Sequence, residues 1–596
     1  MGRSSTILLI FVGCLLLGLS SCGPPIKQGL KAQAGGDRSY QAMDFRGWDL
    51  QHTSFKNADV HDVDFRFALL QGADFSHSDL ENADLRGTSL DGANFTGSNI
   101  NEALFFEADM RGAIFDLVNW DGHKFRDAKL AKTSFRSAQL SYTDFTGADL
   151  TKSDFSDTDL RYTTFDYAQL IEVKFNKANL SGLDLHNHDL RGVDLSGANL
   201  TNTNLSQANL KGAKLSGATL VGTNFEGANL LGIDFSGVYL DQIKLKGAKL
   251  KAPRFAGAQI KRVSFDGLDL SHSSFKEAWL RGVSFHEVNL TGSDFSLARL
   301  EDTLMLKSNL TLANISGADF SAALLYQTNF TKVQFEQTLF PTIFEPKTKT
   351  TFVQAPMGCY TMGNNFEDSV GFDASPHEVC LNDFFVATKE VTQLQFASLL
   401  GYNPSYHGKR SEQRPIENIN AHEIRRFLAE FEALTTFKVR LPTEAEWEYV
   451  CRELGAKVRY GNGKNTASPL EIVYDGTKPS ALNRDPTYQS KLVWGETLDV
   501  GSSKPNKLGV FDMSGNVAEV VSDQWDSKAY QRPKKTVGMR ATQGIRGGHF
   551  DSSASDIRCA KRSFMTTEEM DRHVGFRMVK VIDPNEVLNN QRFQLK

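Results

Sequence analysis

The chain has little net charge and few cysteines for its length. Its 596 residues include 66 Lys and Arg, 71 Asp and Glu, and six Cys, which leaves a formal net charge of −5. So small a charge provides no strong attraction to nucleic acid, and we expect no nucleic-acid partner. The apolar run at residues 6–19 is too short to cross a membrane as a permanent helix. A chain of this length is expected to form two or three domains.

Residues 1–21 have the pattern of a targeting segment. Arg3 precedes the uncharged apolar run, which ends in Leu-Ser-Ser-Cys-Gly with Cys22 as the cysteine. Small residues before such a cysteine resemble a bacterial lipobox. The resemblance implies cleavage before Cys22, lipidation of Cys22 and anchoring in the cell envelope, where Gly23 favours the outer membrane or cell surface over the inner membrane. An ordinary secretory signal with an incidental cysteine is the alternative.

The strongest pattern is a period of five residues. Every fifth residue from Phe45 to Phe340 is apolar, and almost all of them are Phe or Leu. On an α-helix five residues advance about 500°, so the apolar positions would not form a stripe. On a strand an odd step places successive residues on opposite faces. The backbone must therefore turn a corner after each unit, which predicts a solenoid.

The repeated units resemble the pentapeptide-repeat family, A(D/N)LXX. Typical units are Ala73-Asp74-Phe75 and Ala198-Asn199-Leu200, in a run of roughly 60 units. The resemblance implies a right-handed quadrilateral β-helix with four units per coil and about 15 coils. Some cytoplasmic members of the family mimic DNA. We do not expect that function here, because residues 1–21 have the pattern of a targeting segment. The open ends of a solenoid need caps, for which residues 22–42 and 341–350 are the candidates.

The rhythm stops at Phe352, and the remaining sequence predicts an irregular α+β domain. A helix is expected over residues 421–434, where Ile424, Phe427 and Phe431 recur at helical spacing. The predicted organisation is therefore a signal (1–21), a linker or N-terminal cap (22–42), the β-helix (43–340), a linker or C-terminal cap (341–350), a further domain (351–582) and a tail (583–596).

Several stretches of this domain resemble the formylglycine-generating enzyme or sulfatase-modifying-factor family. They are Met362-Gly363, the run RLPTEAEWEY at 440–449, the run GVFDMSGNV at 509–517, and Arg546-Gly547-Gly548 followed by Gly575-Phe576-Arg577. Their order and spacing match the family from Phe352 to about Val581. The resemblance implies an elaborated C-type-lectin-like fold with little regular secondary structure.

The resemblance gives little support for oxidase activity in this chain. Family oxidases hold copper with two cysteines shortly after the Gly-Gly pair, but residues 547–558 contain no cysteine, and Ser552 stands where the first would be. A thiolate pair selects cuprous copper and a hydroxyl does not replace it. No copper is expected, and oxidase activity is not expected. The glutamates Glu444, Glu446 and Glu448 match a structural element of the family.

The four cysteines outside residues 1–22 lie in this domain, and export permits disulfides. Cys359 and Cys380 each sit in a short strand-like run, which makes a cross-strand pair plausible. The family resemblance implies a second pair, Cys451–Cys559. It also implies a structural calcium site formed by the carboxylates of Asp512 and Glu519 and the carbonyls of Gly515 and Val517, which are hard ligands suited to Ca²⁺. A solvated turn without metal is the alternative.

The segment that forms the active groove in the oxidases is rich in polar and aromatic residues here. Exposed side chains of this kind on a rigid scaffold suit ligand binding. The predicted ligand-binding surface comprises His549, Phe550, Asp551, Ser552, Asp556, Arg558, Arg562 and His573. Ordinary surface loops without a specific ligand are the alternative.

Together these patterns predict a lipid-anchored bacterial envelope protein whose rod presents a non-catalytic domain for protein or glycan binding. Two alternatives stay open: a divergent enzyme of the sulfatase-modifying class, and a scaffold subunit of an envelope complex. The ligand, the leaflet and the oligomeric state are not predicted by the sequence.

Overall fold

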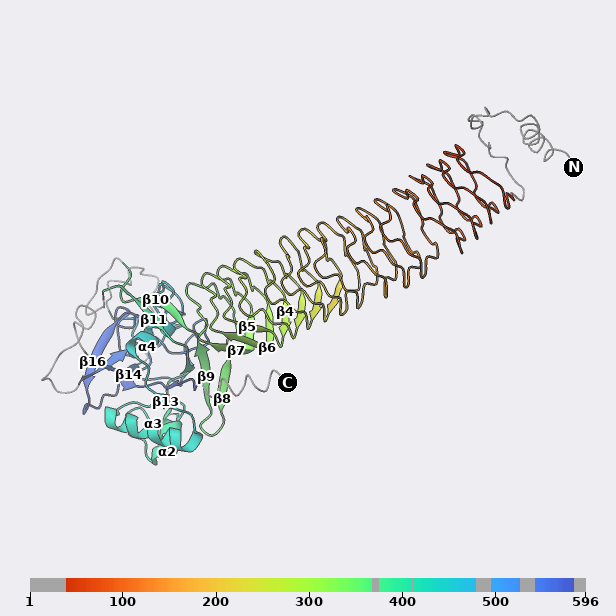
Figure 1. The fold of residues 1–596 in the computed structure, drawn as a ribbon. Coiled ribbons are helices and arrows are strands. Elements are labelled where there is room, and N and C mark those ends of the chain that lie inside the picture. The colour runs from red at the N-terminus through yellow and green to blue at the C-terminus, as the bar shows by residue number, and fades with distance from the viewer. Residues whose placement is uncertain (1–38, 367–374, 409–410, 479–494, 526–541, 584–596) are drawn as a thin grey trace, which may run out of the picture. The chain divides into compact units, whose positions relative to one another are not determined.

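The computed structural model describes residues 39–366, 375–408, 411–478, 495–525 and 542–583. The chain divides into two compact units, and we describe each by itself. Unit 1 ends at Pro253 and holds repeat coils, whereas unit 2 begins at Arg254 and holds the later coils and the C-terminal domain (Figure 1). Among the described residues, no helix has the length and apolar character needed to span a bilayer.

The coils of unit 1 stack with a period of 20 residues. Parallel bridges join residues such as Asp74 to Asn94 and Asn94 to Ile114, and the short strands β1 (Thr219–Val221) and β2 (Tyr239–Asp241) pair in the same register. Four pentapeptides therefore form one turn, as the family resemblance implies. This confirms the β-helix.

The fifth-residue side chains fill the interior of each coil. The rings of Phe55, Phe75 and Phe95 are fully buried and stack on one another, with centroids 4.8 and 4.9 Å apart. Each ring removes a large apolar surface from water and meets the same residue type in the next coil. Because the sequence is periodic, the same contact is repeated from one coil to the next.

The position two residues before each fifth residue also points inward and is mostly small, and several of its residues are threonines. The hydroxyls of Thr143 and Thr203 donate to the carbonyls of Trp120 and Leu180, at 3.0 and 2.8 Å. Each accepting carbonyl lies 23 residues earlier, in the preceding coil. A buried hydroxyl needs such a partner, and here the partner ties one coil to the next.

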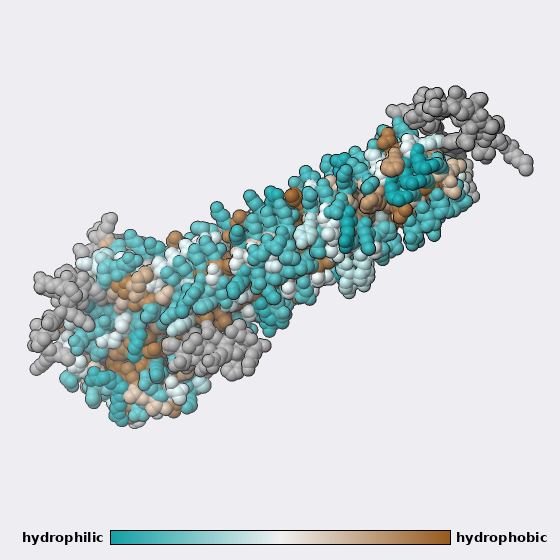
Figure 2. Space-filling view, viewed as in Figure 1, coloured by the Kyte–Doolittle hydropathy of each residue, from teal (hydrophilic) through white to brown (hydrophobic). Residues whose placement is uncertain are grey.

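The corners of the coils follow a rule that the sequence analysis does not identify. In unit 1 the second residue after each apolar position adopts positive φ, as at Gly147 (71°) and Asn202 (56°). Glycine and asparagine reach this conformation at least cost, but many corners carry larger residues. These corner side chains point outward, and the visible face of the coils is mostly hydrophilic (Figure 2).

The coils begin before the predicted start at residue 43. Ser39 already pairs with Asp59, and the ring of Tyr40 packs against Phe45 and Phe55 at 6.3 and 5.6 Å. Tyr40 stands five residues before Phe45 and so occupies an inward position of the repeat. Residues 39–42 of the predicted cap therefore belong to the first coil.

Unit 2 opens with coils of the same design. Their parallel strands keep the 20-residue register, for example Trp279 opposite Arg299 and Met305 opposite Leu325. The strands are β3 (Gln259–Lys261), β4 (Trp279–Arg281), β5 (Ser284–His286), β6 (Arg299–Leu306) and β7 (Asp319–Tyr326).

The C-terminal domain contains three sheets and three helices within its described residues. The first sheet has the order β13 (Val439–Arg440), β18 (Val579–Lys580), β12 (Phe384–Ala387), β9 (Thr350–Ala355) and β8 (Thr342–Glu345). The second pairs β10 (Gly358–Met362) with β11 (His377–Leu381). The third has the order β16 (Arg562–Thr566), β15 (Thr542–Arg546), β14 (Ala518–Gln524) and β17 (Val574–Gly575).

The helices are α2 (Gln393–Leu400), α3 (Ala421–Thr435) and α4 (Glu444–Cys451). The predicted helix over 421–434 is confirmed as α3, and Asn420 caps it by accepting the amide protons of His422 and Glu423. Phe396 of α2 stacks on Phe427 of α3 at 5.6 Å in the buried core. This core supports the sheets and loops that carry the site.

The segment 341–350 is not a linker. Residues Thr342–Glu345 form β8, which pairs with β9 in the domain's first sheet. Within unit 2 the domain also covers the last coil. Phe330 donates its amide proton to Met357 (2.8 Å), Gln354 donates to the carbonyl of Leu325 (2.7 Å), and the Thr331 hydroxyl accepts from Cys359 (2.9 Å). The domain therefore caps the coils, as the need for a cap predicts.

Candidate functional site

A groove of about 510 Å³ lies in the C-terminal domain beside the ends of β14, β15 and β17. We call it the histidine groove. It contains five of the eight residues predicted for the ligand-binding surface, together with Lys478 and Asp571. The five are His549, Asp551, Ser552, Asp556 and His573. Whether they bind a ligand stays a prediction.

Two histidines form the centre of the groove. The rings of His549 and His573 lie 4.3 Å apart between centroids. Burial, with the nearby charge of His573, lowers the pKa of His549 to about 4, so its ring is neutral at neutral pH. Its Nδ1 accepts the Asp551 amide proton at 3.2 Å. The hydrogen of the neutral ring therefore lies on Nε2.

A carboxylate orients the second histidine. Asp571 Oδ1 lies 2.7 Å from His573 Nδ1 and also accepts the backbone N–H of His573 at 2.9 Å. This hydrogen bond to His573 holds the pKa of Asp571 below its usual range. His573 Nε2 lies 4.0 Å from Asp551 Oδ2 and has no hydrogen-bond partner among the described residues.

The groove also carries fixed charges of both signs. Lys478 Nζ donates to Asp551 Oδ1 at 2.7 Å, and this hydrogen bond keeps the pKa of Asp551 below its usual range. Asp556 lies 3.0 Å from Lys561 and accepts from the Ser553 hydroxyl at 2.6 Å. The groove therefore offers neutral imidazole, carboxylate, ammonium and hydroxyl groups in fixed positions.

Three residues predicted for this surface are buried instead. Phe550 (2% exposed) packs under the groove, with its ring 5.2 Å from that of His573. Arg558 is 2% exposed and donates to the carbonyl of Ser555. Arg562 is 3% exposed and its guanidinium pairs with Glu444. They support the groove, because each has its polar or aromatic group engaged inside the domain.

The three glutamates of the 440–449 run are paired with arginines. Glu444 pairs with Arg562, and Glu446 accepts two hydrogen bonds from Arg440 at 2.6 and 2.7 Å. A carboxylate engaged in this way serves structure, as the sequence analysis predicts.

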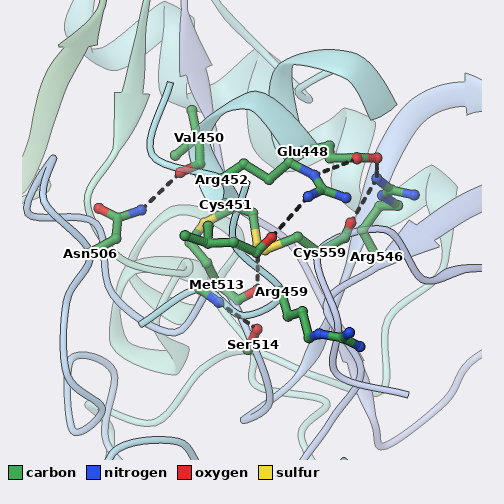
Figure 3. The surroundings of a disulfide bond; sticks show 12 residues. Glu448, Val450, Cys451, Arg452, Arg459, Asn506, Met513, Ser514, Arg546 and Cys559 are labelled. Carbon is green, nitrogen blue, oxygen red and sulfur yellow. Dashed lines mark hydrogen bonds and ion pairs between the residues drawn. A yellow bond between two sulfur atoms is a disulfide. The ribbon is translucent and has the colours of Figure 1, made fainter. Parts of the chain in front are cut away.

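Glu448 lies at the centre of a buried network beside a disulfide (Figure 3). It is fully buried, and both Arg452 (2.7 Å) and Arg546 donate to it. Burial alone would raise the pKa of Glu448, but the two guanidinium groups hold it below its usual range. Arg546 also donates to the Cys559 carbonyl at 2.9 Å, which links the charges to the disulfide.

Both predicted disulfides are present. Cys359 and Cys380 face each other across β10 and β11, and Cys451 at the end of α4 is bonded to Cys559. The described residues therefore contain no free thiol. At the predicted place of the first copper cysteine, the Ser552 hydroxyl accepts the His549 amide proton at 3.0 Å. These residues do not fit a cuprous ion, which needs thiolate ligands.

The predicted calcium ligands fit a cation poorly. Both carboxylate oxygens of Glu519 accept hydrogen bonds from Arg577, at 2.6 and 2.7 Å, and Trp447 donates to one of them at 2.8 Å. Asp512 is buried, and its Oδ1 has no hydrogen-bond partner among the described residues. Because Arg577 already neutralises Glu519, the four residues do not form a calcium cage.

A third carboxyl group shares this interior. Glu390 accepts from the Asn516 side chain at 2.8 Å, and burial, followed by the charges of Asp512 and Glu519, raises its pKa well above the usual value. Within the described ranges, the groups that could hold a metal ion are Cys359–Glu378–Cys380, in which the sulfurs are bonded to each other, and Asp59–His61–Asp79. Neither includes Asp512 or Glu519.

The sequence analysis missed three residues of the groove and its surroundings. Lys478 comes from a loop 73 residues before Asp551, and no local pattern connects the two. His407 does not line the groove but packs its ring at 5.1 Å against Phe550, which lies 143 residues later in the sequence. Asp571 could have been predicted from the motif Asp-x-His, which it forms with His573. The same motif places the carboxylate of Asp59 against the ring of His61.

Comparison with known proteins gives the family of each region. Residues 339–582 match the sulfatase-modifying factor enzyme 1-like domain. Pentapeptide-repeat models match residues 68–105, 86–119, 124–157, 153–192, 189–227 and 306–340, and a pentapeptide repeat region matches 240–315. The chain thus consists of pentapeptide repeats followed by a sulfatase-modifying-factor domain, as the resemblance implied.

The curated relatives include two that each match about a quarter of the chain. The chaperone protein LppX of Paenibacillus barcinonensis is 30% identical over 183 residues, which cover 24% of this chain and 64% of that protein. The formylglycine-generating enzyme of Streptomyces coelicolor is 33% identical over 155 residues, covering 24% and 47%. The chain therefore spans less than two thirds of either relative. The solved Treponema denticola variable protein 1 is 21% identical, with a TM-score of 0.32 over 40% of this chain and 98% of that one.

Proposed function

We propose that this chain is a lipid-anchored bacterial envelope protein whose C-terminal domain binds a protein or glycan in the histidine groove without oxidase chemistry. The observation that carries the proposal is the groove itself. Its centre is formed by His549, Asp551 and His573, and Ser552 occupies the place of a copper-binding cysteine. Groups of this kind suit recognition, whereas dioxygen chemistry at copper needs sulfur ligands.

The arrangement favours a ligand that offers several hydrogen bonds. Asp551 is an acceptor and Lys478 a donor, and their side chains are 41% and 43% exposed. Polar groups that are held in place before binding reduce the entropy lost on association. The relative from Paenibacillus barcinonensis is named a chaperone protein, which supports a protein as the ligand.

Capture of the ligand tests the binding proposal. The full chain would be crosslinked in intact cells and compared with Asp551→Asn, which keeps the size of the side chain but removes its charge. We expect one partner to be captured by the parent chain and lost with Asp551→Asn. His422→Asn, at an exposed position of α3, is the matched control and should retain the partner. Retention by Asp551→Asn would contradict a role for the groove.

Turnover distinguishes binding from the enzyme alternative. The formylglycine-generating enzyme relative provides the reason to test it. We expect the chain to leave a cysteine-containing sulfatase peptide unchanged in the presence of Cu(I) and oxygen. Conversion of that cysteine to formylglycine would overturn the non-catalytic proposal.

The lipid anchor is proposed on the lipobox-like sequence ending at Cys22, which lies outside the described residues. Metabolic labelling with a fatty-acid analogue should mark the parent chain and should not mark Cys22→Ala. Fractionation should then place the labelled chain in the outer membrane. Label on the Cys22→Ala variant, or a soluble parent chain, would reject the anchor.

A further inference from the structure

Three exposed tyrosines lie at neighbouring corners of the coils in unit 1. Tyr142, Tyr162 and Tyr167 expose 67%, 66% and 89% of their surface. All three have positive φ, a conformation that glycine or asparagine adopts at lower cost. In the column of Tyr142 and Tyr162, the next coils carry Gly182 and Asn202. The fold therefore has no need of aromatic rings at these corners.

Two of the rings form an ordered stack with an open space beside it. The rings of Tyr142 and Tyr162 are parallel within 9°, with centroids 5.1 Å apart. At some corners a side chain covers the glycine of the next coil, as His77 covers Gly97, whereas other corner glycines, such as Gly122 and Gly212, are uncovered. A Cβ added at Gly182 would likewise have no atom within 4 Å. The space over Gly182, next in line after Tyr162, is therefore empty.

This space belongs to a groove of about 560 Å³ that runs over three coils. Tyr162 and Gly182 line it, together with polar side chains that include Arg161, Asp184 and Asn202. Arg161 is held by Asp159 at 2.7 Å and Asp184 by the Asn204 amide at 2.9 Å. The polar groups of the groove are thus fixed before any ligand arrives.

We propose that this groove, which we call the tyrosine groove, binds a neutral pyranose saccharide with one sugar ring stacked on Tyr162. A pyranose has an apolar face of C–H bonds that suits an aromatic ring, and hydroxyls around its rim that suit amides and charged side chains. The charge of Arg161 is already balanced by Asp159, so this arginine does not favour an anionic ligand over a neutral one. A nucleobase also stacks on tyrosine, but a nucleic acid needs a basic surface to neutralise its phosphates.

Two variants test the tyrosine groove while retaining the fold. Tyr162→Asn removes the stacking ring, and Gly182→Asn fills the empty space. Both variants introduce asparagine, the residue type that occupies the same corner at Asn202 with φ 56°. Tyr167→Asn is the matched control, because Tyr167 is more exposed and does not line the groove. Unchanged thermal midpoints would show that all three variants fold.

The probes are soluble hexasaccharides of glucose and of N-acetylglucosamine, added to the full chain without sugar-based detergents. Saturation-transfer NMR should show at least one bound hexasaccharide, with transfer strongest to the axial protons of one sugar face. Tyr162→Asn and Gly182→Asn should each weaken binding about tenfold, and Tyr167→Asn should not. Absence of binding at about 5 mM, or binding that neither variant weakens, overturns the proposal.

Discussion

The coils of unit 1 and the C-terminal domain of unit 2 are stabilised by different kinds of contact. In the coils each stabilising contact is repeated, as in the stacked rings of Phe55, Phe75 and Phe95. In the domain the central contacts are single and join residues far apart in sequence, such as Glu448 with Arg546. A repeated contact can be lost once at modest cost, whereas a unique buried charge pair has no substitute.

The largest expected effect comes from the buried pair of the domain. Glu448→Gln removes the buried carboxylate that both Arg452 and Arg546 contact, at a cost of about 3–5 kcal/mol. Hydrogen exchange read by mass spectrometry should show faster exchange across the C-terminal domain and no change in the coils of unit 1.

Glu172→Gln provides the matched control for that experiment. Glu172 is an exposed carboxylate of a coil, 3.4 Å from Lys152, and surface pairs contribute less than about 1 kcal/mol. An effect of Glu172→Gln as large as that of Glu448→Gln would remove the distinction between the two regions.

The next effect concerns the disulfide bonds. Among the described residues, both lie in the C-terminal domain. Replacing Cys451 and Cys559 together with alanine should cost about 2–4 kcal/mol, because their bond closes a loop of 108 residues in the unfolded chain. A reducing agent should lower the denaturation midpoint of the domain and leave that of the coils unchanged. Equal sensitivity of both regions would contradict this account.

A pH-dependent effect of about 1–2 kcal/mol is expected from His549. Its pKa is about 4 in the folded state, below the ordinary value of 6.5. The unfolded chain therefore binds the proton more readily, so stability is complete above pH 6.5 and falls as the pH drops toward 4. His549→Gln should lose less stability between pH 7 and 4.5 than the parent chain in urea titrations.

His422→Gln is the control for the titration, since His422 is exposed on α3. It should show the same decline with pH as the parent chain. Parallel curves for all three proteins would mean that His549 does not titrate as its burial requires.

The smallest effect is expected within the coils. Thr143→Val removes a buried hydroxyl whose partner is the Trp120 carbonyl, at a cost of about 1 kcal/mol. Exchange should increase in the two coils that the hydrogen bond joins, and the neighbouring coils should be unaffected. Spread of the effect over all of unit 1 would show that the coils unfold as a single cooperative body.

More of the coils than of the C-terminal domain could be predicted from the sequence. The reason is whether a residue's position depends on a local pattern or on distant partners. The inward Phe and Leu positions follow from a local period, so the solenoid could be predicted, and the family resemblance added the four units per coil. Burial in the domain depends on distant partners: Arg562 is inside because Glu444, 118 residues earlier, neutralises it. The same limit explains why Phe550, whose ring packs against the distant His407, was assigned to the surface, and why Lys478 was missed beside Asp551.

The cap on the last coil affects how copies of the chain could associate. A solenoid with a bare terminal edge is a template on which another molecule can add a strand and extend the stack indefinitely. Here the amide of Phe330 and the carbonyl of Leu325 are already bonded within unit 2. Growth of a fibre from this edge would first require the domain to detach.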